Sequence, residues 1–200
     1  MSSDADARHA PIELWRLAGG LLTYFYHLFG DASRIAALHT VTAKSRALML
    51  TWLRAAEAML RRLLLIEAAG YARALRAKRA RKPRVRQKKL VAFDSETPEQ
   101  WRVSFRALDH KRARRRSAVA RRDPVRFHSS WPLALRYEAL IRVYNNPTPF
   151  ARRLASRLRA EPSRAAAVLA QPLPSVGREQ IGAATPLAEA ACARFRPDSS

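Results

Sequence analysis

Cysteine and long apolar runs are the features that this chain of 200 residues lacks most clearly. Cys192 is the only cysteine, which excludes an intramolecular disulfide, a two-cysteine metal site and a CxxC redox pair. No run of about 18 uncharged apolar residues is present, so we expect no membrane-spanning helix. The N-terminal residues also lack the basic and apolar layout of a secretory signal, and we therefore expect a cytoplasmic protein.

Motifs for catalysis and metal binding are missing as well. The sequence has no glycine-rich phosphate loop and no GxSxG motif. Its histidines are scattered, and none has an acid or a cysteine at the spacing of metal ligands. The sequence therefore predicts a protein that is not an enzyme and that uses no cofactor, no metal ion and no small-molecule substrate.

Positive charge is the feature that is present in excess. Lysine and arginine number 38 against 16 acids, which gives a formal net charge of +22. Such a charge creates a strong field that attracts anionic partners. Alanine, leucine and arginine are abundant and β-branched residues are few. Since the first three lead the scale of helix propensity, this composition predicts a mainly α-helical fold.

Two runs concentrate the positive charge. Residues 73–89 contain ten cations, residues 111–122 contain seven, and neither run contains an acid. On a helix the second run would place cations on every side, which suits contact with phosphates and not the reading of bases. We predict that both runs bind anionic polymers, above all nucleic acid, without sequence specificity; the alternative is a solvated basic linker. The cations predicted to bind are Arg79, Arg81, Lys82, Arg84, Arg86, Lys88, Lys89, Lys111, Arg112, Arg114, Arg115, Arg116, Arg121 and Arg122.

A first helix is expected between Pro11, a residue typical of a first turn, and Gly30, a residue typical of a helix end. All but a narrow polar stripe of this helix is apolar, so one neighbouring helix cannot cover it. It must be enclosed by several helices, meet a protein partner or another copy, or dock on a membrane. The last alternative would make the chain a peripheral membrane protein that binds through helix 12–29. The residues predicted to form the interaction surface are Trp15, Leu22, Phe25, Phe29 and Trp52.

A second, longer helix is predicted from a cap at Asp31 or Ser33 to about Arg79. Its core positions hold a repeat of three and four residues over about five heptads, as in a coiled coil. Glu57 and Arg61 form an i,i+4 pair on its outer side. The two helices should form an antiparallel hairpin over residues 11–80, and the far half of the longer helix needs a further partner. The repeat consists of Ile35, Leu38, Thr42, Ser45, Met49, Trp52, Ala56, Met59, Leu63 and Ile66.

A basic linker is predicted over residues 81–128, with a short strand pair within residues 90–106. Trp101, Val103 and Phe105 alternate there with Arg102 and polar neighbours, which is the period of a strand. A small helical cluster should follow over residues 129–171, whereas residues 1–10 and 172–200 are predicted to be flexible.

Three short helices should make up the helical cluster. Ser130 is expected to cap the first helix, which stops at Asn145 and Asn146. Thr148 is expected to cap the second helix, and the third should begin near Ser163.

Two segments, WRVSFRAL at 101–108 and SWPLALRYEALIRVYNNPTPFARRLASRL at 130–158, are similar to parts of small Ala/Arg-rich bacterial proteins of unknown function. The resemblance spans roughly residues 35–164. It implies no activity and assigns no site residue.

Together these patterns predict a mainly α protein in which a helical hairpin with a long second helix packs on a cluster of short C-terminal helices. A minor β-hairpin is expected near residues 90–106. The predicted function is that of a non-enzymatic interaction protein that meets a protein partner or another copy through its first two helices and nucleic acid through its basic segments.

Overall fold

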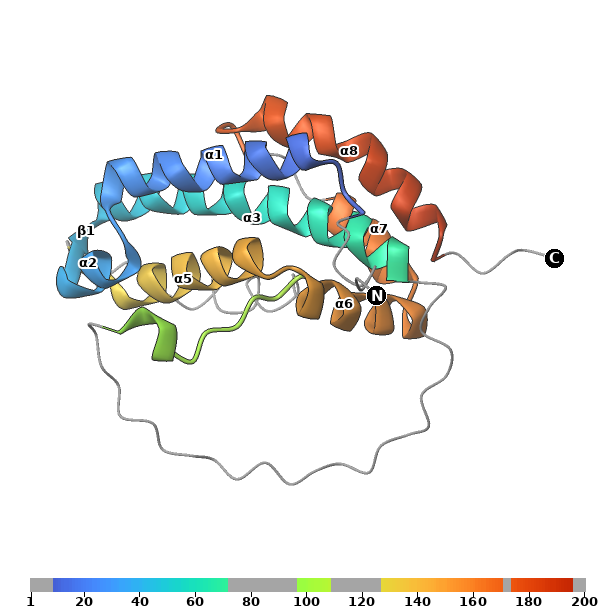
Figure 1. The fold of residues 1–200 in the computed structure, drawn as a ribbon. Helices are drawn as coiled ribbons and strands as arrows, with labels where there is room; N and C mark the ends of the chain where they lie inside the picture. The colour runs from blue at the N-terminus through green and yellow to red at the C-terminus, as the bar shows by residue number, and fades with distance from the viewer. Residues whose placement is uncertain (1–8, 72–96, 109–126, 171–173, 196–200) are drawn as a thin grey trace, which may run out of the picture.

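The computed structural model describes residues 9–71, 97–108, 127–170 and 174–195. They form a mainly helical protein with a small antiparallel sheet, which confirms the predicted fold class (Figure 1). In chain order the elements are α1 (Ile12–Phe29), α2 (Ala32–Ala37), β1 (Thr40–Thr42), α3 (Ala43–Tyr71), the 3₁₀ turn η2 (Pro98–Gln100), β2 (Phe127–Ser129), α5 (Trp131–Asn145), α6 (Thr148–Ala160), α7 (Ser163–Leu169) and α8 (Arg178–Ala193).

Helix α1 begins and ends where the sequence predicts. The carbonyl of Pro11 accepts a hydrogen bond from the Leu14 N–H at 3.2 Å, which starts the helix. Gly30 has a φ of 83°, in the left-handed region that glycine tolerates, and its N–H donates to the Tyr26 carbonyl at 2.7 Å. The chain can therefore turn directly into α2.

The single long helix predicted from Asp31 to Arg79 is wrong in its first part. Asp31 does cap a helix, because its Oδ1 accepts from the Arg34 N–H at 2.6 Å, but α2 ends at Ala37. β1 follows and pairs antiparallel with β2, with Val41 opposite His128. Thr40, Val41 and Thr42 are β-branched and favour a strand, and β2 supplies partners for their backbone. The end predicted at Arg79 lies outside the described residues.

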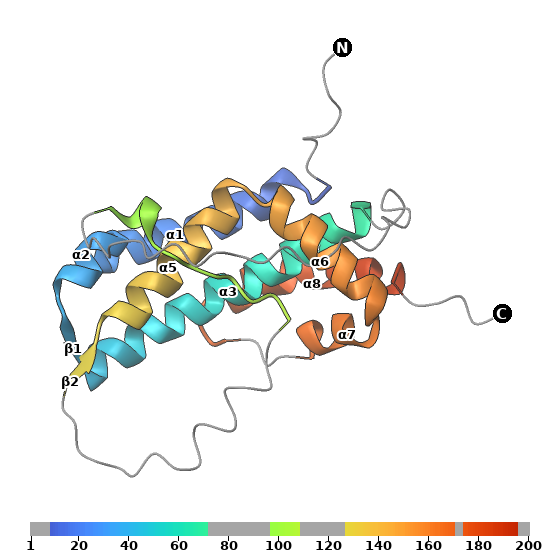
Figure 2. The ribbon, with the colours of Figure 1, turned by 90° about the horizontal axis from the view of Figure 1, so that it is seen from below.

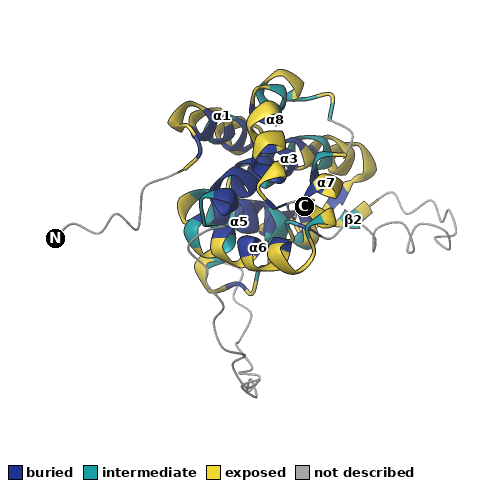
Figure 3. Cartoon of the chain, turned by 90° about the vertical axis from the view of Figure 1, so that its right-hand side faces the viewer, coloured by how far each residue is buried: buried dark blue, intermediate teal, exposed yellow. Residues whose placement is uncertain are grey.

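Helix α3 lies at the centre of the molecule. Its half from Leu53 to Ala69 is buried on nearly every side, so no single neighbour could cover it. Figure 3 shows α3 surrounded by α1, α5, α6, α7 and α8. The predicted repeat is buried at Ile35, Met49, Ala56, Met59, Leu63 and Ile66, whereas its members Leu38, Thr42 and Ser45 are exposed.

The predicted antiparallel arrangement of the first helix and the long one is present as α1 and α3, which lie side by side and run in opposite directions (Figure 1). This packing corrects the predicted interaction surface. Trp15 and Phe25 are each only 1% exposed, Leu22 is buried, and Phe29 and Trp52 are half-buried. The part of the apolar face of α1 that includes Trp15, Leu22 and Phe25 is thus enclosed by helices of its own chain.

The predicted cluster of three short helices is present as α5, α6 and α7. Ser130 precedes α5 as expected, but its side chain donates to the Ala36 carbonyl at 3.4 Å instead of capping α5. Helix α6 begins at Thr148 itself, so Pro147 takes the capping position one residue before the predicted cap. The shift is small because either proline of Pro147-Thr148-Pro149 suits a helix start.

The prediction of a flexible tail over residues 172–200 is wrong for most of the segment. Residues 178–193 form α8, which packs along α3. Its buried side chains are Ile181, Ala184, Ala188, Ala191 and Cys192, which are mostly small. Small side chains let two helices approach closely, but they give a weak apolar pattern in a sequence, and Pro186 inside α8 resembles a helix stop.

The N-terminal residues are also attached more firmly than predicted. Glu67 of α3 is 3% exposed and accepts hydrogen bonds from the N–H of His9 at 2.9 Å and of Ala10 at 3.2 Å. The Trp15 indole donates to the same carboxylate at 3.3 Å. Three donors thus satisfy a buried charge and fix the chain before α1, while residues 1–8 lie outside the described residues.

Residues 97–108, which we call the strap, lie inside the predicted basic linker but pack on the core. The predicted strand pair is not found there: the strap has one 3₁₀ turn and then an extended course, and residues 90–96 lie outside the described residues. The predicted alternation is nevertheless confirmed, since Trp101 is buried, Val103 and Phe105 are half-buried, and Arg102 and Arg106 are exposed. Seen from below, the strap crosses α5 and continues toward α6 (Figure 2).

Replacing Ala184 by Leu tests the packing of α8 on α3. Ala184 is 0% exposed, so the larger side chain should overpack the interface and lower the free energy of unfolding by about 1–3 kcal/mol in urea denaturation. Ala183→Leu, at the exposed neighbouring position, is the control and should be nearly neutral. Equal, small effects of both substitutions would contradict the packed α8.

Candidate anion-binding site

All fourteen cations predicted from the sequence to bind polyanions lie outside the described residues. The described residues nevertheless gather arginines in one region, where the strap meets α3, α5 and α6. This region was not predicted from the sequence.

The strap is held by contacts at its first residues. The ring of buried Trp101 lies 5.4 Å from that of Trp131 at the start of α5. Arg142 of α5 donates to the Pro98 carbonyl at 2.5 Å and to Glu138 at 2.6 Å. These contacts fix the direction of the strap, so that its exposed arginines occupy defined positions.

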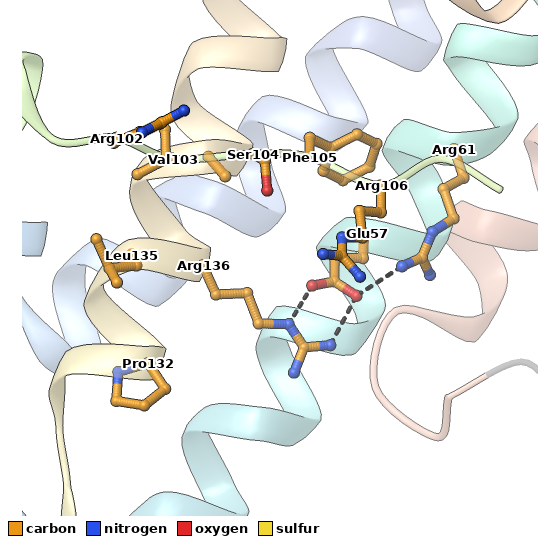
Figure 4. Close-up of a pocket in the computed structure, with 11 residues that line it drawn as sticks. Glu57, Arg61, Arg102, Val103, Ser104, Phe105, Arg106, Pro132, Leu135 and Arg136 are labelled. Carbon is orange, nitrogen blue, oxygen red and sulfur yellow. Dashed lines mark hydrogen bonds and ion pairs between the residues drawn. The ribbon is translucent and has the colours of Figure 1, made fainter. Parts of the chain in front are cut away.

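A pocket of about 380 Å³ lies between the strap, α3 and α5 (Figure 4). Its charged lining residues come from three separate parts of the chain. Apolar residues complete the walls, among them Pro132 and Leu135 of α5. We call this cavity the arginine pocket, after Arg61 of α3, Arg102 and Arg106 of the strap, and Arg136 of α5, which line it with Glu57 of α3.

Glu57 is the acid that organises the arginine pocket. It accepts hydrogen bonds from Nε and Nη2 of Arg136, the latter at 2.6 Å, and from Nη2 of Arg61 at 3.0 Å. The Glu57–Arg61 pair was predicted, but on the outer side of the helix; Glu57 is instead only 6% exposed. Two guanidinium groups compensate the buried carboxylate, as a buried charge requires.

Positive charge exceeds negative charge in the lining of the pocket. Its described residues include four arginines and one acid, Glu57. Burial lowers the pKa of Arg61, and the positive charge of Arg136 lowers it further, while Glu57 acts in the opposite direction. Arg61 therefore lies where its charge is costly to hold and where an additional anion would be stabilising.

Helix α6 extends the positive surface beyond the pocket. It contains no acid, and its buried positions Ala151, Leu154 and Leu158 face the core. Arg153 and Arg157 line a small cavity together with Phe105 of the strap, so α6 adjoins the strap directly. We call the four exposed arginines of this helix the α6 arginines: Arg152, Arg153, Arg157 and Arg159.

A second hollow, of about 680 Å³, lies near the start of α2 and has a different character. Exposed apolar side chains such as Leu28, Leu38 and Leu48 line it, with Asp31 and Arg34 among its charged residues. These two opposite charges leave no excess of either sign, so this hollow does not share the chemistry of the arginine pocket.

Other kinds of site find little support in the described residues. No three side chains of His, Cys, Asp or Glu gather there to hold a metal ion. None of the described helices combines the length and the hydropathy that crossing a membrane requires. Comparison with family models, curated proteins and solved structures finds no match to the chain.

Removing the charge of Glu57 tests its role as the organiser of the pocket. Glu57→Gln leaves Arg61 and Arg136 without their shared carboxylate, and we expect the free energy of unfolding to fall by about 3–5 kcal/mol. Chemical denaturation followed by circular dichroism measures this change.

Glu161→Gln provides the control, because Glu161 pairs with Arg164 at the surface, where both side chains are about half exposed. That substitution should change stability by at most about 1 kcal/mol. A Glu57→Gln variant as stable as the control would show that the buried pairs do not organise the pocket.

Proposed function

We propose that the protein is a non-enzymatic interaction protein that binds nucleic acid through its phosphate backbone, without sequence specificity. The observation that carries the proposal is the exposed α6 arginines, of which Arg153 and Arg157 adjoin the strap at Phe105 and Ala107, on either side of the exposed Arg106. Helix α6 contributes no acid to this surface. In the sequence the strap lies between the cation runs at 73–89 and 111–122, so the chain links both runs to this surface.

The physical basis is the release of condensed counterions. Each arginine that neutralises a phosphate frees a counterion from the nucleic acid, so binding weakens as salt rises. A helix of 13 residues such as α6 extends over roughly 20 Å, enough to follow several phosphates of one strand. Arginine suits this contact because its planar group donates paired hydrogen bonds to phosphate oxygens.

The apolar face of α1 is not part of the surface proposed to bind nucleic acid. The interaction surface predicted on this helix includes Trp15 and Phe25, and both are buried under the chain's own helices. The apolar side chains that stay exposed on α1 are Ile12, Leu17, Tyr24, Tyr26 and Leu28. No arginine cluster of the kind found on α6 accompanies them, since Arg16 is the only cation of that helix apart from its histidine.

Fluorescence anisotropy with a labelled single-stranded DNA oligonucleotide tests the proposal. The double variant Arg153→Gln, Arg157→Gln should bind more weakly and should reduce the slope of log K against log salt by about 1.4, at roughly 0.7 for each lost contact. The unaltered protein should lose most of its affinity between about 50 and about 200 mM salt.

Arg178→Gln, Arg194→Gln is the matched control, since it removes the same charge from exposed positions at the two ends of α8. It should leave the salt slope close to that of the unaltered chain. Equal losses in both double variants would mean that net charge alone matters, and no binding by the unaltered chain would refute the function.

A further inference from the structure

Three guanidinium groups of the arginine pocket converge on one point. Figure 4 shows Arg61, Arg106 and Arg136 extending toward the Glu57 carboxylate from α3, the strap and α5, whereas Arg102 lies toward the other end of the strap. Convergence of cations from three elements differs from the spread of the α6 arginines along one exposed helix. It is the arrangement expected of a site that surrounds a compact anion.

Glu57 holds Arg61 and Arg136 in place through the hydrogen bonds that both donate to its carboxylate. Its two oxygens engage Nε and Nη2 of Arg136, so the Nη1 group of Arg136 lies outside this pair. A guanidinium group carries five N–H donors, and one carboxylate can accept only some of the donors around it. Glu57 therefore fixes the Nη1 group of Arg136 at a defined place in the pocket, where it can donate to a second anion in the manner of a preorganised site.

The charge of the lining selects the kind of anion. With four arginines and one acid, the described lining has an excess of three positive charges. A phosphate monoester carries about −1.5 to −2 charges at pH 7 and has three oxygens that accept hydrogen bonds. A phosphodiester within a strand carries one negative charge, so it matches the excess of positive charge in the lining less well. It is also linked to a nucleoside on each side, so the strand would have to enter and leave the pocket.

The size and the apolar wall suit a ligand that is larger than a free anion. A volume of about 380 Å³ is within the range of about 300–1,000 Å³ that is typical of small-molecule sites. Val103, Pro132 and Leu135 line the pocket along with the arginines and can contact the uncharged part of the ligand. The Arg61 guanidinium lies 5.8 Å from the ring centre of Phe105, which helps to hold Arg61 at the wall.

We propose that the arginine pocket is a specific site for a phosphate monoester and that it takes the terminal phosphate of a nucleic-acid strand. This inference rests on the proposed function for the identity of the ligand, although the phosphate site itself follows from the pocket. A terminal phosphate is the only phosphate monoester of an unmodified strand, so the pocket would distinguish strand ends from strand interiors.

Three labelled oligonucleotides of one sequence test the inference, carrying a phosphate at the 5′ end, at the 3′ end, or at neither. In anisotropy titrations at one salt concentration we expect at least one phosphorylated form to bind about tenfold more tightly than the unphosphorylated form. Equal affinity for all three would overturn the terminal-phosphate site while leaving the proposed function intact.

Variants assign the preference to the pocket. Arg106→Gln changes an exposed residue of the strap, so the fold should persist, and the tenfold preference should disappear. Arg159→Gln, which removes the same charge from α6 outside the pocket lining, should keep the preference while lowering all affinities alike. Loss of the preference in Arg159→Gln but not in Arg106→Gln would place the phosphate elsewhere and contradict the inference.

Inorganic phosphate separates the pocket from the nucleic acid. When it replaces chloride at constant ionic strength, it should raise the melting temperature of the unaltered chain and not that of Arg106→Gln. It should also abolish the preference for phosphorylated ends. If no oligonucleotide binds, the proposed function is refuted. The melting experiment then tests the phosphate site by itself, and an unchanged melting temperature in phosphate would overturn that site.

Discussion

The structure depends on the enclosure of α3. From Leu53 to Ala69 this helix is buried on nearly all of its sides, so its apolar surface can be removed from water only by several neighbours at once. Helices α1, α5, α6 and α8 supply that cover (Figure 3). The two acids in this buried half, Glu57 and Glu67, both have hydrogen-bond donors from other elements. Burial of α3 and satisfaction of its charges thus set the positions of the surrounding helices.

The positive surface follows from that enclosure. Helix α6 has to present Ala151, Leu154 and Leu158 to the core, and the helical period then turns its arginines outward. Helix α5 brings Arg136 to Glu57, and the strap, fixed by Trp101 against α5, closes the pocket over both. The composition gives the excess of positive charge only as a total, whereas the fold holds part of this charge at defined positions on the surface.

Elements with strong local signals could be predicted from the sequence. Pro11, Gly30 and Asp31 mark real helix boundaries because each acts through its own backbone or side chain. The break between α2 and α3 was missed, since Leu38 and Thr42 fit the spacing of the helical repeat although both are exposed. Helix α8 was missed because its buried face consists largely of alanine and because Pro186 lies on its exposed face.

The candidate site could be predicted only in part. The alternation of the strap was visible, and so was the Glu57–Arg61 pair, because both are local patterns. Arg106 and Arg136 join this pair from parts of the chain 45 and 75 residues beyond Arg61, and no local spacing connects them. The sequence shows clusters of cations at residues 73–89 and 111–122. The arginines of the pocket are instead isolated in the sequence, so nothing distinguishes them from the other arginines of a basic chain.

Hydrogen exchange with and without a phosphorylated oligonucleotide shows whether the arginines that the enclosure of α3 leaves exposed on α6 and the strap bind nucleic acid, as we propose. We expect slower exchange of backbone amides in the strap and α6 when the oligonucleotide is bound, with α8 unchanged. Protection confined to α8 and the exposed side of α1, with no change in the strap or α6, would contradict the proposal.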